Sequence, residues 1–98
     1  MKHNYEITGK VLEIRTYLET VFLFVQGATP KSIENKVIKF ELDTSNTSLD
    51  DRKKVASLMI GANICVEKQF QGERSYYYEF ETLETCISAS TCFMYLES

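Results

Sequence analysis

The residues of this chain that could take part in chemistry are carboxylates, three cysteines, one histidine and a set of aromatic rings. The histidine, His3, lies at the start of the chain, where a solvated side chain is expected rather than a general base. Carboxylates such as Glu79 and Glu81 alternate along the sequence, which is typical of the solvated face of a sheet. No nucleophile elbow, phosphate-binding loop or zinc-ligand pair occurs. We therefore predict a protein that is not an enzyme and uses no metal or cofactor.

The cysteines Cys65, Cys86 and Cys92 are an odd number and form no C-x-x-C pair. A secreted disulfide scaffold would favour an even number, and a free cysteine is often buried as a small hydrophobe. Burial is the expected role, and a Cys86–Cys92 redox pair is left open. The N-terminus lacks the apolar region of a signal peptide, and no apolar run is long enough to span a membrane. We expect a cytoplasmic protein without a membrane partner.

The stretch R-S-Y-Y-Y-E-F-E, residues 74–81, is the densest group of aromatic residues. In a strand, alternate side chains point to opposite faces. Tyr77 then shares a face with Glu79 and Glu81, and this face must be exposed because burying unpaired carboxylates is costly. The other face is predicted to enter the core with three rings: Tyr76, Tyr78 and Phe80.

The stretch V-F-L-F-V, residues 21–25, offers a second pair of rings. Its aliphatic row suits a core, so Phe22 and Phe24 are expected to point outward. In the next expected strand, residues 36–44, Lys39 lies on the outward-facing side. It would therefore lie beside these two rings if the two strands pair. Rings and cations together are how single-stranded nucleic acids are held. A protein partner, a second copy or the apolar tail at residues 92–96 would cover the same patch equally well.

The distribution of charge limits the kind of partner. The net charge is −3, and all eleven basic residues lie within residues 1–74, whereas residues 75–98 hold four acidic residues and no base. A protein that binds duplex DNA or RNA through bulk electrostatics would normally show the opposite balance. We therefore do not expect that mode of binding.

Hydrophobic periodicity predicts one mainly β domain over residues 1–98. In the first strand, residues 5–17, the apolar phase slips by one between Val11 and Leu12, shortly after Gly9. A glycine with such a slip is typical of a bulged, bent strand. A loop is expected at residues 28–35. The remaining strands are predicted at residues 18–27, 36–44, 62–70 and 75–84.

One helix is expected between the third and fourth strands. Ser48 is a suitable N-cap, and the acidic residues that follow it suit the start of a helix. Val55, Leu58 and Met59 form an apolar stripe. Gly61 is well placed to end the helix.

This β-β-β-α-β-β order, with a bent first strand that contains glycine, resembles the OB-fold, a five-stranded Greek-key barrel. The resemblance covers about residues 4–84 and leaves the tail at 85–98 as a sixth strand or a docked end. The segments that carry it are Y-E-I-T-G-K-V-L-E-I, K-V-I-K-F-E-L and S-L-M-I-G-A-N-I-C-V-E-K-Q-F.

In the OB family the ligand usually binds on the outer surface of strands two and three and on the loops joining strands one-two and four-five. For this chain the resemblance implies a binding module whose site residues, with Tyr77 added, are Tyr17, Phe22, Phe24, Lys39, Arg74 and Tyr77. Single-stranded DNA or RNA is slightly favoured as the ligand by the resemblance alone. A protein partner or self-association through the same surface is the alternative.

Overall fold

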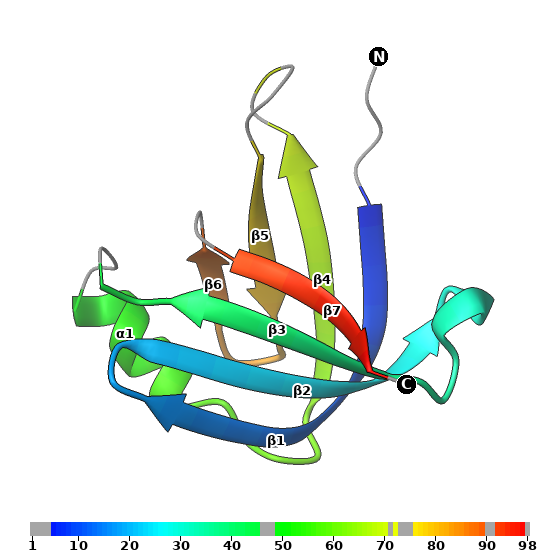
Figure 1. The fold of residues 1–98 in the computed structure, drawn as a ribbon, viewed down its shortest axis with the longest axis horizontal. Helices are drawn as coiled ribbons and strands as arrows, with labels where there is room; N and C mark the ends of the chain where they lie inside the picture. The colour runs from blue at the N-terminus through cyan, green and yellow to red at the C-terminus, as the bar shows by residue number, and fades with distance from the viewer. Residues whose placement is uncertain (1–4, 46–48, 71, 73–75, 90–91, 98) are drawn as a thin grey trace.

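Strands dominate the part of the chain that the computed structural model describes, which comprises residues 5–45, 49–70, 72, 76–89 and 92–97. The first five strands and the α-helix follow the order β-β-β-α-β-β, and two further strands come after them (Figure 1). In chain order the elements are β1 Tyr5–Tyr17, β2 Thr20–Thr29, the 3-10 helix η1 Lys31–Ile33, β3 Val37–Asp43, α1 Leu49–Ala56, β4 Asn63–Phe70, β5 Tyr76–Glu81, β6 Cys86–Ala89 and β7 Cys92–Glu97.

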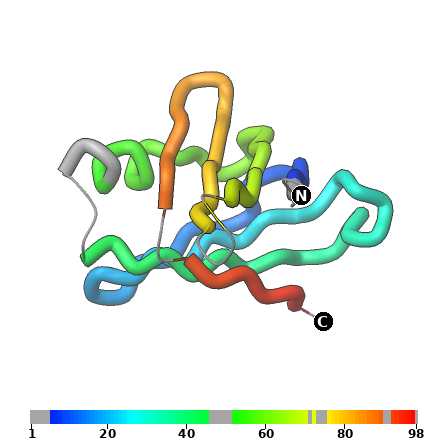
Figure 2. The backbone as a smooth tube through the Cα atoms, turned by 90° about the horizontal axis from the view of Figure 1, so that it is seen from above, coloured from blue at the N-terminus to red at the C-terminus, as the bar shows by residue number. Residues whose placement is uncertain are grey.

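All strand pairs are antiparallel and belong to one sheet with the order β6-β5-β4-β1-β2-β3-β7. β1 belongs to both halves of this sheet, since residues 5–10 pair with β4 and residues 8–17 pair with β2. The sheet therefore folds over itself at β1, and its two halves face each other as two layers (Figures 1 and 2).

The predicted five-stranded Greek-key barrel is not confirmed. Within the described residues the sheet contains seven strands and is not closed, with β6 and β7 at its edges. Both edge strands come from the tail at residues 85–98, which was expected to supply one strand or none. β6 continues the antiparallel run from β5 after the turn at residues 82–85, and β7 pairs with β3 in the other half of the sheet.

The bend in β1 confirms the predicted irregularity near Gly9. The register with β2 shifts between Thr8 and Gly9 and again between Val11 and Glu13, so Leu12 is the extra residue of a bulge. A Cβ atom on Gly9 would overlap the backbone oxygen of Gln26, because β1 and β2 approach closely at the bend. Glycine is needed here for space rather than for an unusual φ.

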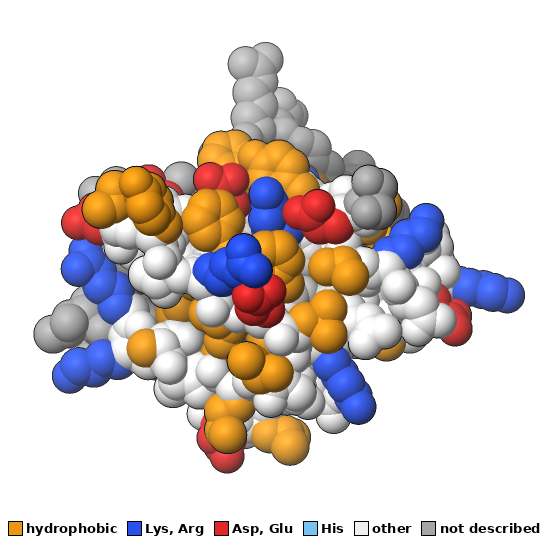
Figure 3. All heavy atoms as spheres, turned by 60° about the horizontal axis from the view of Figure 1, so that its bottom comes forward, with side chains coloured by type: hydrophobic (Ala, Val, Ile, Leu, Met, Phe, Trp, Pro, Cys, Tyr) orange, Lys and Arg blue, Asp and Glu red, His pale blue; other side chains and the backbone are white. Residues whose placement is uncertain are grey.

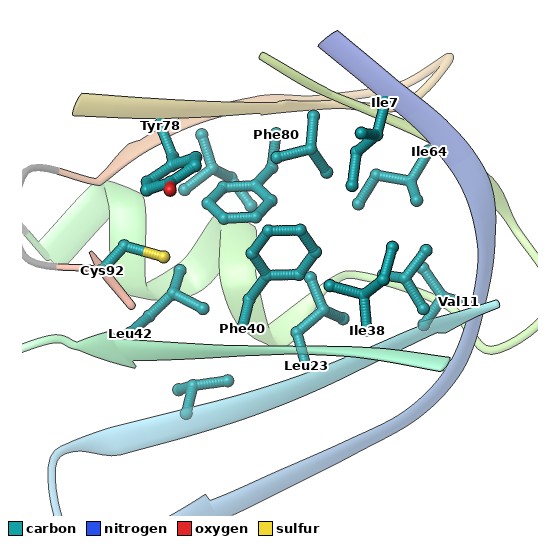
Figure 4. Packing of buried hydrophobic residues seen from close by; sticks show 14 of the residues in the cluster. Ile7, Val11, Leu23, Ile38, Phe40, Leu42, Ile64, Tyr78, Phe80 and Cys92 are labelled. Atoms are coloured by element: carbon teal, nitrogen blue, oxygen red, sulfur yellow. The ribbon is translucent and has the colours of Figure 1, made fainter. Parts of the chain in front are cut away.

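The core fills the space between the two layers. Phe80 and Tyr78 on β5 project toward Phe40 and Leu42 on β3, as Figure 4 shows. Val21, Leu23 and Val25 are buried as predicted. Further buried side chains come from β1, β4 and the tail: Ile7, Val11, Ile64, Val66, Ile87 and Cys92.

Tyr76 was predicted to be a core residue and is not, since 39% of it is exposed. It is the first residue of β5 and pairs with Phe70, the last residue of β4, so it lies at the outer end of the hairpin. Its ring packs edge-on against Tyr78, at 5.8 Å between centroids, and Lys68 Nζ lies 4.0 Å from its centroid. Strand alternation predicted the correct face of β5 for Tyr76, but the opposite layer does not extend to the outer end of the β4–β5 hairpin.

The bounds of two predicted elements, the second strand and the helix, also differ from those in the structure. The second strand was predicted from residue 18, but Leu18 and Glu19 form the turn between β1 and β2. Leu18 has a positive φ of 55°. The turn is held by Thr44, whose backbone N–H and Oγ1 both donate hydrogen bonds to the Glu19 carbonyl, at 2.7 and 2.6 Å.

The helix is shorter than the apolar stripe suggested. α1 ends at Ala56, five residues before Gly61, which has a φ of +88° in the turn that leads to β4. Val55 is buried and Leu58 half-buried, but Met59 lies beyond the helix and is exposed. The predicted N-cap, Ser48, lies outside the described residues.

Candidate functional site

Rings and cations gather on the outer face of the layer formed by β1, β2, β3 and β7. The strand register aligns Arg15, Phe22, Glu41 and Phe93 in one row across the four strands. The neighbouring row contains Glu13, Phe24, Lys39 and Tyr95. We call this surface the ring face and define it by six residues: Arg15, Phe22, Phe24, Lys39, Phe93 and Tyr95.

The structure places Phe22, Phe24 and Lys39 together on this outer face, as expected from the alternation of β2 and β3. All three side chains are half-buried, whereas Phe93 and Tyr95 on β7 are exposed. In Figure 3, which brings the lower side of Figure 1 forward, hydrophobic side chains lie among basic and acidic ones. The face is therefore partly apolar and is open to a partner mainly at β7.

Lys39 lies between two rings and a carboxylate. Its Nζ is 5.8 Å from the centroid of Phe22 and 5.0 Å from the centroid of Tyr95, and it is 3.8 Å from Glu97 Oε1. Each cation–π contact, such as those of Lys39 with Phe22 and Tyr95, contributes about 0.5–1 kcal/mol at exposed sites. The ammonium group is thus already engaged with its neighbours on the ring face.

Arg15 has a similar environment on β1. Its guanidinium carbon lies 5.7 Å from the centroid of Phe24, and its Nε donates a hydrogen bond of 2.6 Å to Glu13 Oε1. Both cations of the ring face therefore have a ring and a carboxylate as partners. Glu41 lies in the same row as Arg15, so the two rows contain two carboxylates, Glu13 and Glu41, and two cations. This balance does not favour a phosphate backbone.

The tail does not fold over Phe22 and Phe24. β7 pairs with β3 in the plane of the sheet, and it widens the ring face by adding Phe93 and Tyr95. The alternation of Phe93, Tyr95 and Glu97 in the sequence indicates that they share one face of a strand, but it does not indicate that this strand pairs with β3. Arg15 was also missed. The apolar phase shifts by one residue after Val11, and applying the shifted phase to the rest of the strand would have placed Arg15 on the outer face.

The other predicted site residues are more scattered. Tyr17 is exposed at the end of β1, on the same outer face as Arg15. Tyr77 points outward from β5 opposite Gln69, and β4 and β1 separate it from β2 in the sheet. Partial burial and a hydrogen bond to Glu79 raise the pKa of the Tyr77 phenol. The structure does not bring Tyr77 together with Phe22 and Phe24, and Arg74 lies outside the described residues.

The thiols lie in three different environments. Cys86 is exposed on β6, Cys65 is half-buried on β4, and Cys92 is buried in the core. Burial raises the pKa of the Cys92 thiol to about 12, with a smaller contribution from the carboxylate of Glu41. Burial also raises the pKa of Cys65, and Glu6 and Glu81 add to the effect. Such thiols are mostly protonated at neutral pH and are therefore poor nucleophiles.

Within the described part of the chain, no group of three or more His, Cys, Asp or Glu side chains is arranged to hold a metal ion. The helices described there are too short or too polar to serve as membrane-spanning segments. Comparison with known proteins found no match to a family model, a curated protein or a solved structure. Function is therefore argued from the geometry of the ring face and β7.

Proposed function

We propose that this chain is a non-catalytic binding module that contacts a protein partner through the ring face and the strand β7. One observation carries the proposal: β7 is an edge strand with four consecutive large apolar side chains in contact with solvent. The exposed fractions are 55% for Phe93, 39% for Met94, 45% for Tyr95 and 56% for Leu96. An edge strand of this kind is a template for pairing with another chain, and contiguous exposed apolar residues mark interaction sites.

The charge of the surface supports a protein partner. Residues 92–96 carry no charge, and Glu97 is next to Lys39. Protein interfaces are typically depleted of charge at their centre and enriched in aromatic residues and Met. Phe93, Met94 and Tyr95 fit that composition.

A photo-crosslinking experiment tests the proposal. A photoreactive phenylalanine analogue is placed at Tyr95 and, as a matched control, at Ser88, an exposed residue on the other edge strand. After irradiation in the cells that make the protein, we expect a discrete protein adduct from position 95 and not from position 88. Equal labelling at both positions, or no adduct at position 95, would refute the proposal.

Single-stranded nucleic acid is the second candidate, because Phe22, Phe24 and Tyr95 lie beside Lys39 and Arg15. Base–ring stacking contributes about 1–3 kcal/mol per base. Fluorescence titration with short DNA and RNA oligomers at low salt, on the native chain and on the double variant Phe22→Ala with Phe24→Ala, tests it. Nuclease-sensitive adducts from position 95 would also favour it. Binding that the double variant does not weaken would exclude this face as the site.

A relation to the OB-fold is part of the proposal. It is supported by the bent β1, which pairs with both β2 and β4, and by a helix between β3 and β4. The two extra strands of the tail would then be additions to the five-stranded plan. We also retain the cytoplasm as the proposed location of the protein.

A further inference from the structure

The two edges of the sheet differ in a way that bears on what they bind. β6 has only four residues, and Cys86 and Ser88 on its outer face are small or polar. Short edge strands are one device by which proteins avoid pairing with other chains. β7 has six residues, and within residues 92–97 there is no proline, no lysine and one acidic residue at the end. β7 therefore lacks these protective devices.

The side chains of β7 restrict the strand that can pair with it. Phe93 and Tyr95 lie on the outer face, whereas Met94 and Leu96 lie on the side of Phe40 and Ile38. Because both rows are exposed and apolar, a matching strand must also offer apolar side chains on both of its faces. β7 itself meets this requirement, whereas β6 does not.

The uncharged centre of β7 also allows two copies to meet without like charges facing each other. Each copy places its one carboxylate, Glu97, at the end of the strand, and Lys39 lies 3.8 Å from it. A two-fold axis uses the same patch on both subunits and closes after two copies. Pairing of β7 with β6 of another molecule would instead build an open chain of molecules and would set apolar residues against polar ones.

From these observations we propose that β7 pairs antiparallel with β7 of a second copy of this chain. The two sheets then become one continuous sheet across a two-fold axis, and the two ring faces become one surface. This inference rests on the proposed function and deepens it, since it states that the protein partner is the same chain.

The two-fold axis fixes the registers that are allowed. In an antiparallel pair related by such an axis, one residue lies opposite its own copy. Within β7, axes at Met94 or at Tyr95 leave the largest number of residues paired. In the first register Leu96 faces Cys92 of the second copy, and in the second register it faces Met94 of the second copy. Leu96 therefore meets an apolar residue in either case.

Light scattering after size exclusion tests self-association over about 5–500 μM, the range in which weak pairs dissociate. We expect the mass to rise toward twice that of the monomer. Leu96→Lys places two buried ammonium groups in each dimer, so the association constant should fall by about tenfold or more. The matched control Ser88→Lys adds the same charge to the other edge strand and should leave association unchanged. Circular dichroism and a thermal melt check that each variant is folded.

A strict monomer at every concentration would overturn the inference, as would an equal loss in the two lysine variants. Neither result would decide the proposed function, because the crosslinking at position 95 tests a protein partner of any kind. A monomer that still gives a discrete protein adduct in cells would mean that a different protein occupies β7.

Disulfide trapping tests the register. Met94→Cys, Tyr95→Cys and Leu96→Cys are made separately, with Cys65 and Cys86 replaced by serine and Cys92 by alanine. Cys92 must be removed because it faces position 96 of the second copy in the register centred on Met94. A residue on the axis has its Cα about 4.5–5.5 Å from the Cα of its copy, which is within reach of a disulfide. For the next residue along the strand, the Cα atoms of the residue and its copy are about 8 Å apart. We expect rapid trapping of the dimer at position 94 or at position 95 and none at position 96. Equal trapping at all three positions would contradict the two-fold arrangement.

Discussion

The ring of Phe40 meets the ring of Phe80 edge to face, with centroids 5.2 Å apart and planes at 88°. Phe40 lies on β3 and Phe80 on β5, so this contact joins the two layers of the sheet. Both side chains are completely buried. Aromatic pairs in this geometry add about 0.5–1.5 kcal/mol to the free energy of burial.

Replacing Phe80 by alanine should therefore lower the free energy of unfolding by about 3–5 kcal/mol, because a buried ring is lost and a cavity remains. Urea unfolding followed by tyrosine fluorescence measures the change. Phe93→Ala is the matched control, since its ring lies largely in solvent, and it should cost about 1 kcal/mol or less in the monomer. Equal losses in the two variants would contradict the assignment of Phe80 to the core.

The bend at Gly9 leads to a second prediction. Gly9→Ala should reduce the free energy of unfolding by about 1–3 kcal/mol, because the added methyl group overlaps the Gln26 backbone and the Val25 side chain. Gly72→Ala is the control, since nothing lies within 4 Å of a Cβ atom there. Its effect should stay within about 0.5 kcal/mol. A fully tolerated Gly9→Ala would mean that β1 and β2 are further apart than the structure has them.

Replacing Leu18 by glycine should raise the free energy of unfolding, in contrast to the two substitutions above. Leu18 is 83% exposed and its φ is 55°, a conformation that costs an L-residue about 1–2 kcal/mol and glycine nothing. Leu18→Gly should therefore raise the free energy of unfolding by up to about 1 kcal/mol. Leu83 is also fully exposed in a turn, but its φ is not positive, so Leu83→Gly should lower stability slightly. Thermal melts of the two variants should shift in opposite directions.

The thiol of Cys92 predicts a loss of stability at alkaline pH. Burial raises its pKa from the ordinary value of 9.0 to about 12. The folded state thus favours the neutral thiol, and this contribution is fully present below pH 9 and is lost as the pH rises from 9 toward 12. The slope of unfolding free energy against pH in that window should be smaller for Cys92→Ala than for the native chain. An unchanged slope would show that Cys92 is not buried.

Several features of the fold follow from the sequence because they depend on local pattern. The alternation in V-F-L-F-V separates Leu23 from Phe22 and Phe24, and the slip after Val11 marks the bulge at Leu12. These signals depend on which face of a strand must avoid water. A strand keeps that preference whatever pairs with it, so the faces of β1, β2 and β3 could be predicted.

Other features depend on contacts between distant segments. Tyr76 has the correct phase for the core, but its exposure is decided by where the opposite layer ends. The role of the tail depends on the unpaired edge of β3, and no local pattern in residues 92–97 identifies that partner. Phe93 and Tyr95 were for this reason absent from the predicted site, although they are the most exposed rings of the ring face.

β1 is a member of both layers, and this has a consequence for how the molecule opens. Residues 8–10 of β1 pair with both β2 and β4, and the core lies between the two layers. Separating the layers therefore breaks hydrogen bonds of β1 and exposes buried side chains of both layers at once. Amide hydrogens in β2 and in β4 should exchange with solvent at nearly the same free energy of opening, as parts of a single cooperative unit.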